Sequence, residues 1–260
     1  MSRHLTFSSA ERPKLMGILN VTPDSFSDGG CYSGEDAVRH ALDMIDAGVD
    51  IIDIGGESTR PGSVPVPADE EIGRVIPVLK ELRALTDVPI SVDTMKVSVA
   101  EKALDAGADY INDVNGLRSE GMGELIASSG VGCIIMHMNG TLYNVHTNYR
   151  CSLEDISAFL KERKDYASAS GIKDIVLDPG VGFGKTPELN MQVIDNSKMF
   201  SFGCPVLIGA SRKRFLSEFY PGMGKDEATF KASLRAIRSG ADIVRVHDVA
   251  GMRRFMQGRI

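Results

Sequence analysis

A short phrase that ends a helix and begins a buried strand recurs along the chain. It reads DAGVDIID at residues 46–53 and DAGADYIN at 105–112, returns as SGADIVR at 239–245, and recurs more loosely as GIKDIVLD at 171–178. In each copy a glycine supplies the left-handed conformation that closes a helix, and an apolar strand begins within a few residues. Repeated helix, glycine and strand are typical of an α/β protein built on a parallel sheet.

Eight buried strands are predicted in this way. They lie near residues 15–20, 49–54, 88–93, 109–113, 132–137, 174–178, 205–209 and 242–247. Their spacing averages about 32 residues, which suits successive βα units, and their continuous apolar runs indicate parallel strands covered on both faces. No G-x-G-x-x-G follows the first strand, which disfavours a dinucleotide fold. We therefore predict one domain over residues 1–260, a single (β/α)8 TIM barrel with residues 1–14 as a polar lead-in.

Composition sets further limits. The 260 residues are 43% hydrophobic and 25% charged, which fits one barrel of about 250 residues. The net charge of −6 argues against nucleic acid as an obligate partner, although a local basic cluster can still bind an anion. No apolar run approaches a membrane span. The four cysteines are scattered, with no C-x-x-C pair, which predicts a reducing, cytoplasmic location.

Polar residues stand at the carboxyl ends of the predicted strands, where a TIM barrel carries its active site. They are Asn20, Asp53, Asp93, Asn112 with Asp113, Met136-His137, Asp178, Ser211-Arg212-Lys213, and Arg245 with His247. The first strand also opens into a long polar loop, and the second into a segment that contains Arg60. Carboxylates and amides suit a planar, nitrogen-rich ring, whereas arginines can fork onto phosphate oxygens. The sequence therefore predicts that one end of the barrel binds both a planar, nitrogen-rich ring and a phosphate group.

The same segments resemble the motifs of the dihydropteroate synthase family. They are NVTPDSFSDGG (20–30), DIGGESTRPG (53–62), SVDT (91–94), INDV (111–114), MHM (136–138), DPGVGFGK (178–185), ASRK (210–213) and RVHDV (245–249). The resemblance implies a transferase of folate biosynthesis and a sulfonamide target. Members condense 6-hydroxymethyl-7,8-dihydropterin diphosphate with p-aminobenzoate, giving 7,8-dihydropteroate and pyrophosphate, with Mg²⁺. They usually form homodimers through their C-terminal helices.

Carried over position by position, the resemblance implies a role for each site residue. The pterin would be held by Asp93, Asn112, Met136, Asp178, Phe183 and Lys213. The diphosphate would be held by Asn20, Arg60, Arg245 and His247, with Asn20 also on Mg²⁺. The p-aminobenzoate would be surrounded by Thr59, Arg60, Pro61, Phe183, Ser211 and Lys213.

The expected chemistry is a carbocation-like displacement of pyrophosphate, in which buried carboxylates stabilise the pterin cation and positioning does most of the work. The catalytic set is predicted as Asp28, Asp93, Lys213 and Arg245. Asp28 has two interpretations of equal weight, because it either faces the cation or the metal, or caps a turn.

Two motifs are set aside. DPGVGFGKT resembles a phosphate-binding Walker loop, but Pro179 stands where that motif needs glycine. His137 follows Met136 on a strand, so the two side chains should point to opposite faces, and His137 is expected to be structural at least as readily as ligand-facing.

The chain departs from the family pattern in two places. The loop at 139–150 keeps a glycine but lacks the usual proline, and the helix predicted at 227–239 carries the additional cations Lys231, Arg235 and Arg238. These departures keep open the alternative of a pterin-binding paralogue without turnover. A further alternative is a pterin-dependent methyltransferase, which shares the barrel and the pterin pocket and would not need the diphosphate clamp.

Overall fold

The computed structural model describes residues 3–5, 13–22, 34–58, 64–141 and 151–257, in which strands and helices alternate. The strands are β1 Lys14–Asn20, β2 Ile51–Gly55, β3 Ile90–Asp93, β4 Tyr110–Asp113, β5 Gly132–Met136, β6 Ile175–Asp178, β7 Leu207–Ile208 and β8 Ile243–Val246. The helices are α1 Gly34–Asp46, α2 Ala68–Leu85, α3 Val97–Asp105, α4 Met122–Ser129, α5 Leu153–Ala169, α6 Pro187–Asp195, the 3-10 helix η2 Ser197–Phe200, α7 Leu216–Phe219, α8 Lys225–Arg238 and α9 Val249–Met256.

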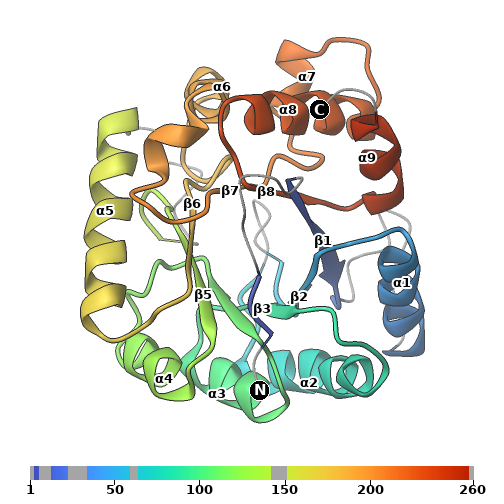
Figure 1. Cartoon of the computed structure of the whole chain (residues 1–260), viewed down its shortest axis with the longest axis vertical. Helices are drawn as coiled ribbons and strands as arrows, with labels where there is room; N and C mark the ends of the chain where they lie inside the picture. Colours follow the sequence, from blue (N-terminus) through green and yellow to red (C-terminus); the bar gives the residue numbers. More distant parts are fainter. Residues whose placement is uncertain (1–2, 6–12, 23–33, 59–63, 142–150, 258–260) are drawn as a thin grey trace.

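The strands form one parallel sheet that curves into a barrel, with the helices in a ring around it (Figure 1). The order is β6-β5-β4-β3-β2-β1-β8-β7, and a parallel bridge between Leu177 and Val206 joins the two end strands. The predicted TIM barrel is therefore confirmed, and each predicted strand is present. β7 is the shortest, at Leu207–Ile208 instead of 205–209, because Pro205 has no amide hydrogen and only its carbonyl accepts, from Leu177.

The glycines of the recurring phrase close their helices as predicted. Gly48, Gly107 and Gly240 have φ values of 82°, 97° and 96°, in the left-handed region. After Gly48 the chain turns back at once, and the Asp50 amide already bonds the Leu15 carbonyl of the neighbouring strand. The phrase therefore sets where each strand enters the barrel.

Apolar side chains fill the middle of the barrel. One buried cluster takes a side chain from most of the strands: Met16, Ile51, Tyr110, Ile134, Val176, Leu207 and Ile243. Because side chains alternate along a strand, the residues two positions further on point to the same interior. Those residues include Asp53, Asn112, Met136, Asp178 and Arg245, at the carboxyl ends of their strands. The barrel thus consists of an apolar layer with a polar layer above it.

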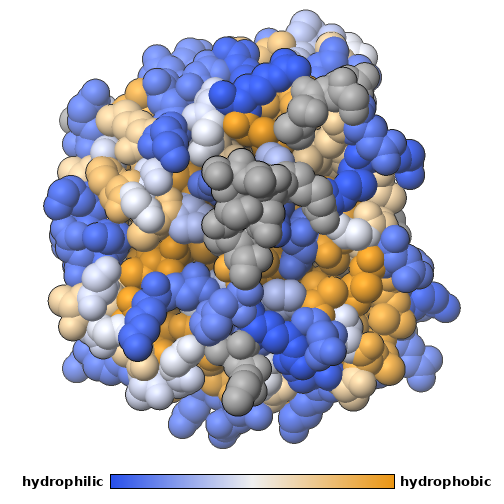
Figure 2. Space-filling view, in the orientation of Figure 1, coloured by the Kyte–Doolittle hydropathy of each residue, from blue (hydrophilic) through white to orange (hydrophobic). Residues whose placement is uncertain are grey.

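A larger apolar cluster lies between the strands and the helices, where the faces of the helices that carry Ala37, Val75, Leu79 and Ala232 are buried. Hydrophilic residues gather towards the periphery of the face shown in Figure 2. None of the helices within the described ranges has both the length and the apolar character that crossing a membrane requires.

Residues 3–5 cover the amino-terminal mouth of the barrel. Leu5 packs on the interior cluster, and its amide donates to the Tyr110 hydroxyl at 2.8 Å. The Arg3 amide bonds Asp109 at 2.7 Å, and His4 Nδ1 lies 2.7 Å from Asp174 Oδ2. This part of the polar lead-in therefore closes the mouth opposite the candidate site.

Candidate active site

Arg245 lies at the centre of the polar layer, between two carboxylates. Its Nη1 donates to Asp53 Oδ2 at 2.6 Å and to Asp93 Oδ2 at 3.2 Å. The Arg245 side chain is 11% exposed, that of Asp53 2% and that of Asp93 19%. Burial by itself would lower the pKa of Arg245, but Asp53, Asp93 and Asp178 raise it above its ordinary value. The guanidinium is therefore a permanent cation with a fixed orientation.

Asn112 joins this cluster through Asp53. Its Nδ2 donates to Asp53 Oδ2 at 3.0 Å, so that one carboxylate oxygen orients both Asn112 and Arg245. Within the described part of the chain, Asp53 Oδ1, Asn112 Oδ1 and Arg245 Nε are buried without a hydrogen-bond partner. Buried polar groups are nearly always paired, so these atoms are ready to bind polar groups of a ligand.

Asp93 has an unusual protonation equilibrium. Burial, with a further contribution from Asp53, raises its pKa from the ordinary value to about 7, although Arg245 opposes the shift. A carboxyl group with this pKa can accept or donate a hydrogen bond near neutral pH, and such groups gather at functional sites. Asp93 is therefore suited to a heterocycle with both ring N–H groups and ring nitrogens.

Asp178, Lys213 and Phe183 form the adjoining wall. Asp178 is 3% exposed, accepts from the Gly180 amide at 2.7 Å, and has a pKa raised by burial. Lys213 Nζ lies 4.5 Å from the centroid of the Phe183 ring and donates to the Val181 carbonyl. Burial lowers the pKa of Lys213 to about 7, with Arg245 lowering it further and Asp178 raising it.

Ser211 and His247 meet beside this wall, at the ends of β7 and β8. Ser211 Oγ lies 2.8 Å from His247 Nδ1, and it also accepts from the His247 amide at 3.2 Å. The residues expected on the diphosphate and on the aminobenzoate therefore touch. Neighbouring Arg212 turns away from them, because its guanidinium pairs with Asp226 of α8 at 2.7 and 3.0 Å.

Asn20 ends β1, the strand that lies between β2 and β8. It pairs in register with Gly55, and a Cβ added to Gly55 would lie 3.7 Å from Asn20 Oδ1 and 3.8 Å from Asp93 Cβ. A Cβ at this position would contact both side chains, and glycine leaves that space open between Asn20 and Asp93. The residues that the structure describes contain no cluster of three or more His, Cys, Asp or Glu that could hold a metal.

Most of the predicted site residues are thus gathered at one end of the barrel. Met136 belongs to a small apolar cluster with Val114, Met138 and Phe183, which provides a surface for a flat ring. Four predicted residues, namely Asp28, Thr59, Arg60 and Pro61, lie outside the described residues.

Two of the residues singled out at the strand ends have structural roles. Asp113 accepts from the amides of Asn115 and Leu117 at 2.7 and 2.8 Å and so shapes the loop after β4. His137 points away from the interior, as its place after Met136 predicts, and its ring lies 5.1 Å from that of Phe159 in α5.

The sequence analysis gave no role to Asp53 or Lys185. Asp53 does carry a detectable signal, because it lies two residues beyond an interior apolar residue, Ile51, and shares its face. Lys185 is buried at 3% exposure in the glycine-rich loop after β6, and lysine is a residue type that is almost never fully buried.

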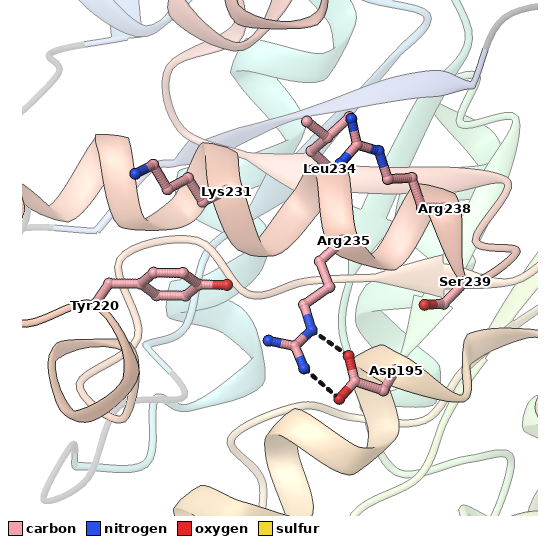
Figure 3. Close-up of a pocket in the computed structure, with 7 residues that line it drawn as sticks. All are labelled: Asp195, Tyr220, Lys231, Leu234, Arg235, Arg238 and Ser239. Atoms are coloured by element: carbon pink, nitrogen blue, oxygen red, sulfur yellow. Dashed lines mark hydrogen bonds and ion pairs between the residues drawn. The ribbon is translucent and has the colours of Figure 1, made fainter. Parts of the chain in front are cut away.

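A separate cavity of about 410 Å³ lies on the outer side of α8 (Figure 3). Arg235 extends from α8 to Asp195 at the end of α6 and bonds both carboxylate oxygens, with Nη2 2.7 Å from Oδ2. The lining consists of Asp195, Tyr220, Lys231, Leu234, Arg235, Arg238 and Ser239. Since these residues come from the helical ring, the cavity is distinct from the candidate active site.

Comparison with known proteins identifies the class to which this barrel and this site belong. A family model described as pterin binding enzyme matches residues 16–247, which is most of the chain. The chain belongs to the pterin-binding enzymes, and within them to the dihydropteroate synthase family, which are transferases of folate synthesis.

Three relatives illustrate the likeness. The dihydropteroate synthase of Clostridium beijerinckii is 45% identical over 251 residues, covering 94% of this chain and 91% of the relative. A Yersinia pestis dihydropteroate synthase structure with a sulfonamide drug has a TM-score of 0.90 at 40% identity and covers 100% of this chain and 97% of its own. The Xanthomonas albilineans dihydropteroate synthase in complex with 7,8-dihydropteroate has a TM-score of 0.83 at 40% identity, with coverages of 95% and 92%.

Proposed function

We propose that the protein condenses 6-hydroxymethyl-7,8-dihydropterin diphosphate with p-aminobenzoate, releasing 7,8-dihydropteroate and pyrophosphate. The observation that carries this proposal is the single polar layer in which Arg245 is held by Asp53 and Asp93. Acceptors for a pterin ring and cations for a diphosphate thus lie within hydrogen-bond distance of one another. The Xanthomonas albilineans relative, which binds the proposed product, supports the same reaction.

The acidic half of the layer suits the pterin. Asp178 and Asp93 can accept from the amino and ring N–H groups, and the unpaired Asn112 Oδ1 offers a third acceptor. Met136 and Phe183 supply apolar contact for the ring faces. Lys213, beside Phe183, can donate to a ring carbonyl or to a carboxylate. Directional bonds around a flat ring fix its orientation, which is the main requirement for the displacement.

The bond changes are simple. The bond between the pterin methylene carbon and the diphosphate oxygen breaks, and its electron pair leaves with pyrophosphate. The aryl amine then donates its lone pair to that carbon, forms the new C–N bond and loses a proton to solvent or to the leaving group. Positive charge accumulates on the pterin, where Asp178 and Asp93 stabilise it, while Arg245 stabilises the departing anion and His247 can donate a hydrogen bond to it.

Mg²⁺ is proposed as the cofactor, bound by Asn20 and the diphosphate. Mg²⁺ prefers oxygen ligands, keeps several waters, and is commonly held by one or two protein groups plus substrate phosphates. The Asn20 side-chain oxygen, next to Asp93 at the strand ends, fits such a site without a dense carboxylate cluster. When bound, the ion would supply Lewis-acid stabilisation of the leaving group.

The test is a turnover assay. Purified protein, both substrates and Mg²⁺ should release pyrophosphate in step with dihydropteroate, and omission of p-aminobenzoate or chelation of the metal should stop both. Tight pterin binding without release would identify the non-catalytic paralogue instead. Tight binding of methyltetrahydrofolate, with no binding of the pterin diphosphate, would identify the methyltransferase.

Sulfonamide inhibition follows from the same proposal. The Yersinia pestis relative was solved with a sulfonamide drug, and an aryl-amine drug should occupy the p-aminobenzoate subsite near Phe183 and Ser211. We expect inhibition that is competitive with p-aminobenzoate. Inhibition that is competitive only with the pterin diphosphate would place the drug elsewhere.

A homodimer through the C-terminal helices and a cytoplasmic location are also proposed. The added cations of α8 are partly neutralised within the chain, because Arg235 pairs with Asp195 and Lys231 lies 3.6 Å from Glu227. Their charge therefore need not prevent two α8 helices from approaching. Light scattering would measure the mass in solution. Cys133, Cys151 and Cys204 are free thiols, which suits a reducing compartment and can be checked by cell fractionation.

A further inference from the structure

Lys185 is buried in the loop after β6, with its ammonium group surrounded by acceptors. The residue is 3% exposed. Its Nζ donates to the carbonyls of Gly180 at 2.8 Å and Phe183 at 3.0 Å, and lies 2.9 Å from His137 Nδ1. The three hydrogens of an ammonium group thus have three partners, two in the loop itself and one at the end of β5.

Burial of a charged lysine in this way carries a desolvation cost. Among the described residues no carboxylate bonds Lys185 Nζ, and burial lowers its pKa to about 7. Burial, reinforced by Lys185 and then Arg118, lowers the pKa of His137 to about 2, so the imidazole is neutral and its Nδ1 accepts. A buried lysine is normally retained only where its hydrogen bonds are needed.

The loop that Lys185 binds carries much of the candidate site. The Gly180 amide donates to Asp178, and the Val181 carbonyl accepts from Lys213. The Phe183 ring also faces the Lys213 ammonium group. Gly180 has a φ of 66°, and a Cβ there would lie 1.8 Å from the His137 carbonyl oxygen. The loop is therefore pressed against the end of β5 in a shape that most residues cannot adopt.

A second tie closes the far end of the loop. The Gly182 amide donates to Asn190 Oδ1 at 2.6 Å, and Asn190 Nδ2 donates to the Lys185 carbonyl at 3.3 Å. Asn190 is 2% exposed. These bonds fix the loop to α6 and do not reach β5. Within the described residues, two side chains connect the loop to the end of β5: Asn139 Nδ2 donates to the Gly184 carbonyl at 3.3 Å, and Lys185 joins the Gly180 and Phe183 carbonyls to His137.

We propose that Lys185 is a positioning residue, which holds the loop after β6 against His137 so that Phe183 and the Val181 carbonyl orient Lys213 towards the substrates. The expected effect of Lys185 on kcat/KM rests on the proposed function. The holding of the loop by Lys185 rests on the loop contacts alone. Lys185 itself does not need to touch a substrate.

The kinetic test is a double-mutant cycle in the full chain. Lys185→Met keeps the length of the side chain but removes its N–H donors. We expect it to lower kcat/KM by about tenfold or more, because a small misplacement of positioning groups is expensive. In a Phe183→Ala background the same change should cost less than it does in the wild type, since the Phe183 ring, one of the two groups through which Lys185 acts, is absent. Equal losses in both backgrounds would overturn the proposal.

The structural test does not depend on turnover. Amide hydrogen exchange in Lys185→Met should accelerate at residues 180–184 by about tenfold or more, while the strands keep their protection. The matched control is Lys173→Met, since Lys173 is an exposed lysine just before β6, and it should leave exchange and kcat/KM unchanged. Unchanged exchange at 180–184 in Lys185→Met would overturn the proposal. If Lys185→Met accelerates exchange at 180–184 but the wild-type protein shows no turnover, the proposed function fails and the role of Lys185 in holding the loop stands.

Discussion

Replacing Asp53 tests whether the Arg245 cluster is assembled in advance of the substrate. Asp53 Oδ2 accepts one hydrogen bond from the cationic Arg245 guanidinium at 2.6 Å and one from the Asn112 side-chain amide at 3.0 Å. Asp53→Ala removes both. Both bonds end on a charged acceptor, and a hydrogen bond to a charged group contributes about 1.5–3 kcal/mol. Arg245 retains Asp93 at 3.2 Å, which compensates in part.

We expect a net loss of about 2 kcal/mol or more in transition-state stabilisation, or roughly a 30-fold or greater fall in kcat/KM. Asp53→Asn keeps the shape of the side chain and one acceptor, so its loss should be intermediate. The assay is initial-rate pyrophosphate release over a matrix of both substrates. Asp105→Asn, at a carboxylate that is 70% exposed on α3, is the matched control and should stay within about twofold of wild type.

Circular dichroism would confirm that each variant is folded. A well-folded Asp53→Ala enzyme whose kcat/KM stays within about threefold of wild type would refute the reasoning. Such a result would mean that Arg245 finds its working orientation without Asp53, and that the short bond between them is not needed for the reaction.

Three further changes address the rest of the site. Asp178→Asn should weaken pterin binding by about tenfold, because a charged acceptor becomes a neutral one, and titration calorimetry that gives native affinity would contradict the assignment. Gly180→Ala should lower the free energy of unfolding in denaturant by at least about 1 kcal/mol more than Gly171→Ala, because both have positive φ but only Gly180 lies against the His137 carbonyl. Equal losses of unfolding free energy in the two variants would show that the loop can move to accommodate a side chain at position 180. The pKa of Asp93 is raised in the folded protein to about 7, so between about pH 4 and pH 7 the folded state holds a proton that the unfolded state has lost, and stability falls as pH rises through that window. Asp93→Asn should flatten that fall, and thermal unfolding at several pH values that shows an unchanged slope would contradict the shift.

The fold was largely predictable because its signals are local. A glycine after an amphipathic helix needs only its own backbone freedom to end that helix, and Gly48, Gly107 and Gly240 do so in the structure. Strand limits were less predictable, since they depend on neighbours. β2 begins at Ile51 and not at Val49, because the Val49 amide still bonds back to the Met44 carbonyl of α1, and β7 keeps only Leu207–Ile208 beside Pro205.

The positions of several candidate site residues at strand ends were predictable, but the contacts between them were not. Asp93, Asn112, Asp178 and Arg245 could be placed at strand ends from sequence alone, and the family motifs gave each a role. Asp53 gained its role only through Arg245, which lies 192 residues away in the chain. Lys185 gained its role only through His137, on a different strand.

By itself, the sequence determined the alternation of helices and strands, the parallel barrel and the end of the barrel at which polar residues collect. These properties follow from periodicity and from glycine, which act over a few residues. The tertiary structure alone decided which polar groups pair, which buried atoms remain available to a ligand, and how burial shifts the pKa values of Asp93, Lys185 and Lys213. Those properties depend on distances between residues on different strands and on the exclusion of water, and both arise only when the barrel closes.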